Sequence, residues 1–169
     1  MAGSNLILIG MPGAGKSTIG VILAKLLALD FLDTDLIIQC REQKTLQQIV
    51  DEQGSLALRK IESDVLSKLE CESSVVATGG SAVYSPTAMA HLKTLGQVLF
   101  LHVSLTELKS RLLNVDTRGL ARQPGQSFED LFHERNPLYE QYADLRIPCD
   151  GLNPEQISHL IVQQLRDIK

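Results

Sequence analysis

The sequence predicts a three-layer α/β fold, in which helices cover both faces of a parallel sheet. Three observations support this prediction. Short apolar runs alternate with longer segments of helical periodicity along the 169 residues, which is typical of strand–helix–strand units. The middle runs are continuously apolar, as expected for strands that are buried on both faces. A glycine-rich loop joins the first apolar run to the first helical segment.

Local signals place the individual elements. The segment 16–29 is predicted to be helical because Ile19 and Leu23 belong to a set of apolar residues spaced three or four apart. Asn153 is a cap residue directly before Pro154, the first-turn proline of the helix expected over 154–168. Ser127 can cap the helix expected over 128–142. We expect strands over 6–9, 31–33, 74–77, 98–102 and 145–147. We expect helices over 16–29, 36–40, 46–52, 55–69, 86–94, 106–113, 128–142 and 154–168.

The bulk composition predicts one globular domain over residues 1–169. Hydrophobic residues make up 44% and charged residues 21%, and no apolar run approaches the ~20 residues that span a bilayer. The N-terminus lacks the basic region of a signal peptide, so we expect a cytoplasmic protein without a membrane partner. We also expect a monomer. A net charge of −4 without a basic stripe argues against nucleic acid. The cysteines and histidines are scattered, which disfavours disulfide or metal sites built from them.

The residues from Gly10 to Ser17 read G-x-x-x-x-G-K-S, the phosphate-binding (P-loop) pattern. Its glycines allow a tight turn that directs several backbone N–H groups toward one point, at the positive end of the next helix. Lys16 can then reach the β- and γ-phosphates, and the Ser17 hydroxyl can ligate Mg²⁺. We therefore expect a site for ATP or GTP that includes Gly13, Ala14, Gly15, Lys16, Ser17 and Thr18.

Asp33-Thr34-Asp35 lies at the end of the second apolar run. The carboxyl ends of parallel strands open onto the ligand crevice, and carboxylates two residues apart can face the same side. One can help to hold Mg²⁺, directly or through its water, while the other orients or deprotonates an attacking hydroxyl. The alternative is a solvated strand end or a helix cap.

Arg59 can bind a substrate carboxylate, whereas Arg135 is unremarkable by itself. Arg59 and Glu62 lie three apart on an expected helix, so Glu62 can fix the Arg59 guanidinium, although the pair could also be an exposed ion pair. Arg135 lies on a later helix, just before a proline that normally signals a kink. Gly79-Gly80 follows the third apolar run, where paired glycines either expose N–H donors to a ligand or form a plain turn.

The segment 114–126 departs from the regular alternation, because it is polar and contains two glycines, a proline and two arginines. A connection of this length in a compact domain is usually disordered or functional. We interpret it as a mobile lid that brings an arginine over a nucleotide, against the alternative of a solvated surface loop. A regulatory switch or nucleotide-binding module is the rival class, but no guanine-specificity motif N-K-x-D is present.

The chain resembles the shikimate kinase family over essentially its whole length. The resemblance depends on the ordered motifs: the P-loop, D-x-D at 33–35, R-x-x-E at 59–62, T-G-G at 78–80 and R-x-P-L-Y at 135–139. It implies a nucleoside-monophosphate-kinase-like fold with a five-stranded parallel sheet in the order 2-3-1-4-5. It also implies ATP- and Mg²⁺-dependent phosphorylation of a shikimate hydroxyl.

The resemblance assigns roles to matching positions. It implies that Lys16, Asp35 and Arg118 are catalytic, with Asp35 as the base and Arg118 in the lid over the phosphates. Ser17 and Asp33 would support the metal, and Arg111 and Pro154 would flank the adenine. It also implies a substrate region over 33–63, with the acceptor bound by Asp35, Arg59, Gly79, Gly80 and Arg135.

Several positions depart from the family pattern around the acceptor. Ser81 replaces a third glycine, and Leu58 and Val50 stand where the family has aromatic residues. The lid reads Arg118-Gly119-Leu120-Ala121 instead of R-P-L-L, and Ser55 replaces a glutamate. Shikimate is the expected acceptor. The alternatives are another small hydroxylated acid, or an ATP-binding family member without shikimate kinase activity.

Overall fold

The computed structural model describes residues 5–112 and 125–167. Its centre is a five-stranded sheet in the order β2-β3-β1-β4-β5, and every neighbouring pair is parallel. This confirms the expected strand order. The strands are β1 (Asn5–Ile9), β2 (Asp30–Asp33), β3 (Ser74–Ala77), β4 (Gly96–His102) and β5 (Leu145–Pro148).

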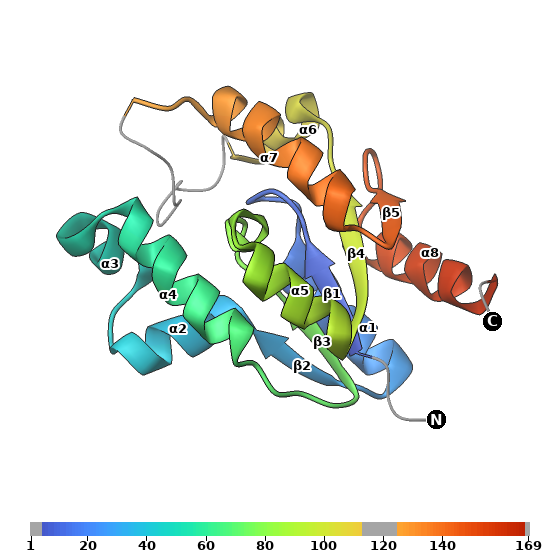
Figure 1. The fold of residues 1–169 in the computed structure, drawn as a ribbon. Coiled ribbons are helices and arrows are strands. Elements are labelled where there is room, and N and C mark those ends of the chain that lie inside the picture. The colour runs from blue at the N-terminus through green and yellow to red at the C-terminus, as the bar shows by residue number, and fades with distance from the viewer. Residues whose placement is uncertain (1–4, 113–124, 168–169) are drawn as a thin grey trace.

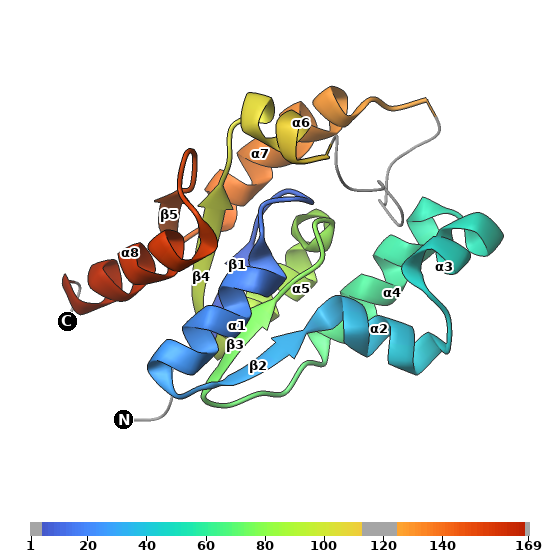
Figure 2. The same cartoon turned by 180° about the vertical axis from the view of Figure 1, so that it is seen from behind.

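Helices cover both faces of this sheet (Figure 1). They are α1 (Lys16–Leu27), α2 (Thr34–Glu42), α3 (Leu46–Gln53), α4 (Ser55–Ser67), α5 (Pro86–Leu95), α6 (Leu105–Leu112), α7 (Phe128–Tyr142) and α8 (Pro154–Asp167). Helices α1 and α8 lie side by side on one face, as the reverse view shows most plainly (Figure 2). Helices α5 and α7 cover the other face, and α2, α3 and α4 project beside the carboxyl end of β2.

The sheet forms the main core because its central strands are buried throughout. β1, β3 and the middle of β4 pack against the inner faces of α1, α5, α7 and α8. A second, smaller cluster holds the projecting helices together and consists of Ile38, Ile49, Leu58 and Val65. The nucleotide-loop end and the projecting helices therefore have separate apolar support. Within the described ranges, no helix has the length and apolar character needed to cross a bilayer.

About half of the element boundaries coincide with the expected ones, and the others differ by one or two residues for local reasons. The helix expected over 16–29 ends at Leu27, because Ala28 takes a left-handed conformation with φ 54° and caps it. The helix expected over 55–69 ends at Ser67, where i→i−3 bonds such as Lys68 N–H to the Val65 carbonyl (3.3 Å) close the last turn. The 3₁₀ turn η1 (Ala82–Tyr84) was not expected.

Two helices are fixed by capping that the sequence signals indicate. Ser127 and Asp130 form a reciprocal capping box at the start of α7. The helix then continues through Pro137 to Tyr142, so this proline does not end it. Asp33 caps α2 by accepting the Asp35 N–H at 3.0 Å, which starts that helix earlier than the expected residue 36.

Candidate active site

The P-loop joins β1 to α1 in the expected strand–loop–helix arrangement. Gly13 and Gly15 have φ of 84° and 90°, in the left-handed region that favours glycine, and Gly15 is the N-cap of α1. Ala14 is buried and its N–H donates to the Met11 carbonyl at 3.1 Å, while Gly13, Ser17 and Thr18 are exposed. The loop therefore presents an open turn at the N-terminus of α1, the position at which phosphate binds best.

The Lys16 ammonium lies inside this turn. It donates to the carbonyls of Gly10 at 2.7 Å and Met11 at 3.0 Å. Burial lowers the pKa of Lys16 to about 8, and the nearby Asp35 carboxylate opposes this shift. The charge is thus held near the loop by two carbonyl groups that an arriving phosphate can replace or supplement.

Asp33 and Asp35 project from the junction of β2 and α2 toward the P-loop. The Ser17 hydroxyl donates to Asp33 Oδ2 at 2.6 Å, which links α1 to the end of β2. Burial raises the pKa of Asp35, and Lys16 lowers it in part. Asp33 is also the cap of α2, which confirms the capping alternative, and its expected role at a metal stays a prediction.

Gly79 and Gly80 lie where the two halves of the site meet. A Cβ on Gly79 would overlap Glu62 Oε1 and lie 2.9 Å from Asp35 Oδ1. A Cβ on Gly80 would lie 2.9 Å from Arg135 Nη1 and 2.9 Å from Pro12 Cδ. Only glycine allows an acid, an arginine and the P-loop to approach the strand end this closely.

Arg59 and Arg135 converge on one ring, although they come from α4 and α7. The Arg59 guanidinium lies 3.8 Å from the centroid of the Tyr84 ring, and that of Arg135 lies 5.1 Å from it. Arg135 is only 1% exposed, and its Nε donates to the Tyr84 hydroxyl at 3.2 Å. The two expected carboxylate anchors therefore belong to one cluster.

Glu62 lies beneath this cluster and is not part of an exposed ion pair. The residue is 3% exposed and accepts a short hydrogen bond from the Ser81 hydroxyl at Oε2. Burial raises the pKa of Glu62 to about 7, while the Ser81 hydrogen bond and the Arg135 charge act in the opposite direction. The serine that replaces the family's third glycine thus directs its hydroxyl to Glu62.

Arg111 contacts the P-loop, and Pro154 is the first residue of α8. Arg111 Nη1 donates to the Gly13 carbonyl at 3.5 Å, and Nη2 pairs with Glu107 at 2.8 Å. Glu107 in turn accepts the Gly151 N–H at 3.4 Å, three residues before Pro154 starts α8. These contacts place Arg111 at the nucleotide loop and connect it through Glu107 to Gly151, in the turn before α8. Arg118 and most of the predicted lid, residues 113–124, lie outside the described residues.

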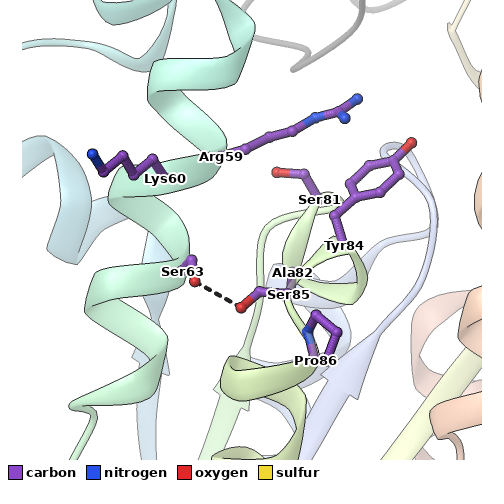
Figure 3. A pocket seen from close by; sticks show the side chains of 8 residues that line it. All are labelled: Arg59, Lys60, Ser63, Ser81, Ala82, Tyr84, Ser85 and Pro86. Atoms are coloured by element: carbon purple, nitrogen blue, oxygen red, sulfur yellow. Dashed lines mark hydrogen bonds between the residues drawn. The ribbon is translucent and has the colours of Figure 1, made fainter.

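A pocket of about 320 Å³ lies between α4 and the segment after Gly80 (Figure 3). In this view Arg59 extends from α4 toward the Tyr84 ring, and Ser81 lies between them. The lining includes Arg59, Ser81 and Tyr84 but not Lys16 or Asp35, so the pocket lies on the α4 side of the arginine cluster and does not reach the P-loop.

Two tyrosines take part in the site although no role was expected for either of them. Tyr84 lies in the unexpected 3₁₀ turn, and its sequence neighbourhood gives no periodic or charged signal. Tyr139 is the last residue of R-x-P-L-Y, and its hydroxyl donates to the Gly80 carbonyl at 2.5 Å. Burial raises the pKa of Tyr139, which keeps the hydroxyl a neutral donor.

A family model described as "Shikimate kinase" matches residues 12–166 of this chain. The chain belongs to the shikimate kinase family. It is 38% identical over 168 residues to the shikimate kinase of Pasteurella multocida, covering 97% of this chain and 94% of that protein. It is 40% identical over 172 residues to the shikimate kinase of Nostoc sp., covering 99% of this chain and 94% of that protein.

Solved structures agree with the membership in this family. A shikimate kinase from Acinetobacter baumannii, determined in complex with shikimate, superposes with a TM-score of 0.90 at 31% identity, covering 99% of this chain and 95% of that one. A deoxyadenosine kinase from M. mycoides has a TM-score of 0.60 at 18% identity, which shows a shared fold. The expected family and the expected three-layer P-loop fold are both confirmed.

Proposed function

We propose that this chain transfers the γ-phosphoryl group of ATP to a hydroxyl of shikimate. The observation that carries the proposal is the placement of Arg59 and Arg135 on one ring, directly across Gly79-Gly80 from Asp35 and the P-loop. A carboxylate bound by the two arginines would leave the rest of a small ring beside Asp35. The likeness to the Acinetobacter protein, whose structure contains shikimate, supports the same acceptor.

On the nucleotide side, the P-loop N–H groups and Lys16 would bind the phosphates. Ser17 and Asp33 would hold Mg²⁺, which supplies charge neutralisation to the transferred group. Their side-chain oxygens lie 2.6 Å apart, and Mg²⁺ suits such a pair because it takes few protein ligands and keeps phosphate oxygens and waters. Arg111 and Pro154 would flank the base, and Arg118 would reach the phosphates from the lid.

On the acceptor side, Asp35 is proposed to orient the reacting hydroxyl and take its proton. The hydroxyl oxygen forms a bond to the γ-phosphorus while the bond to the ADP oxygen breaks, and the proton passes to the Asp35 carboxylate. The raised pKa of Asp35 makes its carboxylate a better proton acceptor than an ordinary aspartate. Most of the rate would come from positioning and charge neutralisation.

The pocket substitutions are compatible with shikimate. Leu58 is buried in the small core with Ile38 and Ile49, so its change from the family pattern adjusts packing. The Ser81 hydroxyl is engaged by Glu62. Leu58 therefore brings no polar group to the acceptor region, and the Ser81 hydroxyl already has a hydrogen-bond partner there.

ADP release at saturating ATP tests the proposal. Shikimate should be compared with a panel of hydroxy acids, sugar acids and amino-acid alcohols. We expect kcat/KM for shikimate to exceed that of every other compound by at least about tenfold. ADP release that stays at the rate with ATP alone when shikimate is added would contradict the proposal.

A further inference from the structure

Tyr84 contacts both arginines through different parts of one side chain. Its ring lies under the Arg59 guanidinium at 3.8 Å, and its hydroxyl accepts from Arg135 Nε at 3.2 Å. Arg59 belongs to α4 and Arg135 to α7, and these elements lie apart in Figure 1. Tyr84, on the turn η1 after Gly79-Gly80, is the bridge between them.

The chemistry of this bridge suits two positive charges. Guanidinium groups close to one another repel, and that repulsion has to be offset before a carboxylate arrives. The electron-rich face of a tyrosine ring attracts one cation, and a hydroxyl lone pair attracts the other. Tyr84 does both without carrying a charge that would compete with a substrate carboxylate.

The hydroxyl is itself oriented by a second contact. It donates a short hydrogen bond to Glu134 Oε1, so its proton points to Glu134 and its lone pairs face Arg135. The other oxygen of Glu134 accepts from Gln126 Nε2 at 2.7 Å. Burial raises the pKa of Tyr84, which keeps this donor protonated.

We infer that Tyr84 is a positioning residue that preorganises Arg59 and Arg135 to receive the acceptor carboxylate. This inference rests on the proposed function. It assigns Tyr84 no contact with the reacting atoms, so its loss acts through the arginines. Preorganised anchors bind more tightly because less freedom is lost on association. The effect should therefore fall on acceptor binding and leave ATP binding unchanged.

Steady-state kinetics of Tyr84→Phe and Tyr84→Leu test this role. Tyr84→Phe keeps the ring under Arg59 but removes the hydroxyl, so KM for shikimate should rise about threefold to fivefold. Tyr84→Leu removes both contacts, and KM should rise about tenfold or more. KM for ATP should stay within about twofold of wild type in both variants.

Matched controls separate positioning from general destabilisation. Tyr142 lies at the C-terminal end of α7, seven residues after Arg135, so Tyr142→Phe and Tyr142→Leu should leave KM for shikimate unchanged. Thermal unfolding should show all four variants folded at the assay temperature. If Tyr84→Leu does not fold, the rise in KM for shikimate of Tyr84→Phe alone tests the inference.

The outcomes of failure are distinct. A wild-type protein without shikimate-dependent ADP release contradicts the proposed function and this inference with it. An active wild type with an unchanged or lower KM for shikimate in the folded Tyr84 variants overturns the inference alone. A lower KM would mean that the ring holds Arg59 away from the substrate.

Discussion

The nucleotide side and the acceptor side of the site are built in different ways. The P-loop is one contiguous segment, and its geometry depends on glycine backbone angles and on main-chain carbonyls that hold Lys16. The acceptor side is assembled from α4, the turn η1 and α7 through contacts between side chains. Substitutions of neighbouring side chains should therefore alter the P-loop geometry little. Substitutions in the side-chain cluster of α4, η1 and α7 can change which acceptor is bound.

The largest expected effect lies on the nucleotide side. Lys16→Ala removes the charge that we propose meets the β- and γ-phosphates, so kcat should fall by on the order of 10³-fold. Initial rates of ADP release measure the loss, and circular dichroism verifies the fold. Lys25→Ala, an exposed lysine on the same helix, is the matched control and should keep wild-type turnover. Near-normal activity of Lys16→Ala would remove the nucleotide assignment.

Asp35→Asn tests the junction between the two sides. The amide keeps the shape of the side chain but cannot accept the hydroxyl proton as a carboxylate does. We expect kcat to fall by about 10²-fold or more, with KM for ATP within about twofold of wild type. Asp51→Asn, at an exposed position on α3, is the control and should keep the wild-type kcat. Equal activity of Asp35→Asn and wild type would place the base elsewhere.

Arg59→Leu tests the acceptor side directly. Loss of a charge-assisted contact to a carboxylate should raise KM for shikimate about 10- to 100-fold, with a smaller change in KM for ATP. Arg41→Leu is the control, because Arg41 pairs with Asp64 at 2.7 Å on the outside of the projecting helices. An unchanged KM for shikimate in Arg59→Leu would mean that no carboxylate is bound there.

The smallest expected effect is on stability and comes from Glu62. Because burial raises the pKa of Glu62 from 4.5 to about 7, the folded protein keeps a proton that the unfolded chain has lost. The stability that this group contributes falls as pH rises from about 4.5 through about 7. Glu62→Gln lacks this dependence.

Urea denaturation at pH 5 and pH 8 measures the difference. The free energy of unfolding of wild type, relative to Glu62→Gln, should drop by roughly 2 kcal/mol between these pH values. Ser81→Ala removes a hydrogen bond that lowers the pKa of Glu62. In this variant the free energy of unfolding should therefore continue to fall up to a higher pH than in wild type. If the free energies of unfolding of wild type and Glu62→Gln change with pH in parallel, Glu62 does not bind a proton in the folded protein as proposed.

Sequence patterns predict the nucleotide side and the layers well because these features are local. The P-loop, the apolar strands and the Ser127 cap each depend on neighbouring residues, and the structure places them as expected. The strand order came from the family resemblance, since alternation alone does not determine which strands pair.

Long-range side-chain contacts were beyond such prediction. Glu62 reads as half of an i,i+3 ion pair on α4, and only the packing of η1 against α4 makes it a buried partner of Ser81. Tyr84 forms its contacts across 25 residues to Arg59 and 51 to Arg135. The helix predicted over 128–142, which runs through Pro137, is confirmed with the same bounds as α7.

We propose that a carboxylate on the acceptor is bound beside the phosphate-transfer site. ADP release with shikimate and with its methyl ester, which lacks the negative charge but keeps the ring hydroxyls, tests it most directly. We expect turnover with shikimate and a KM about 100-fold higher for the ester. Equal KM values for the two compounds would contradict it.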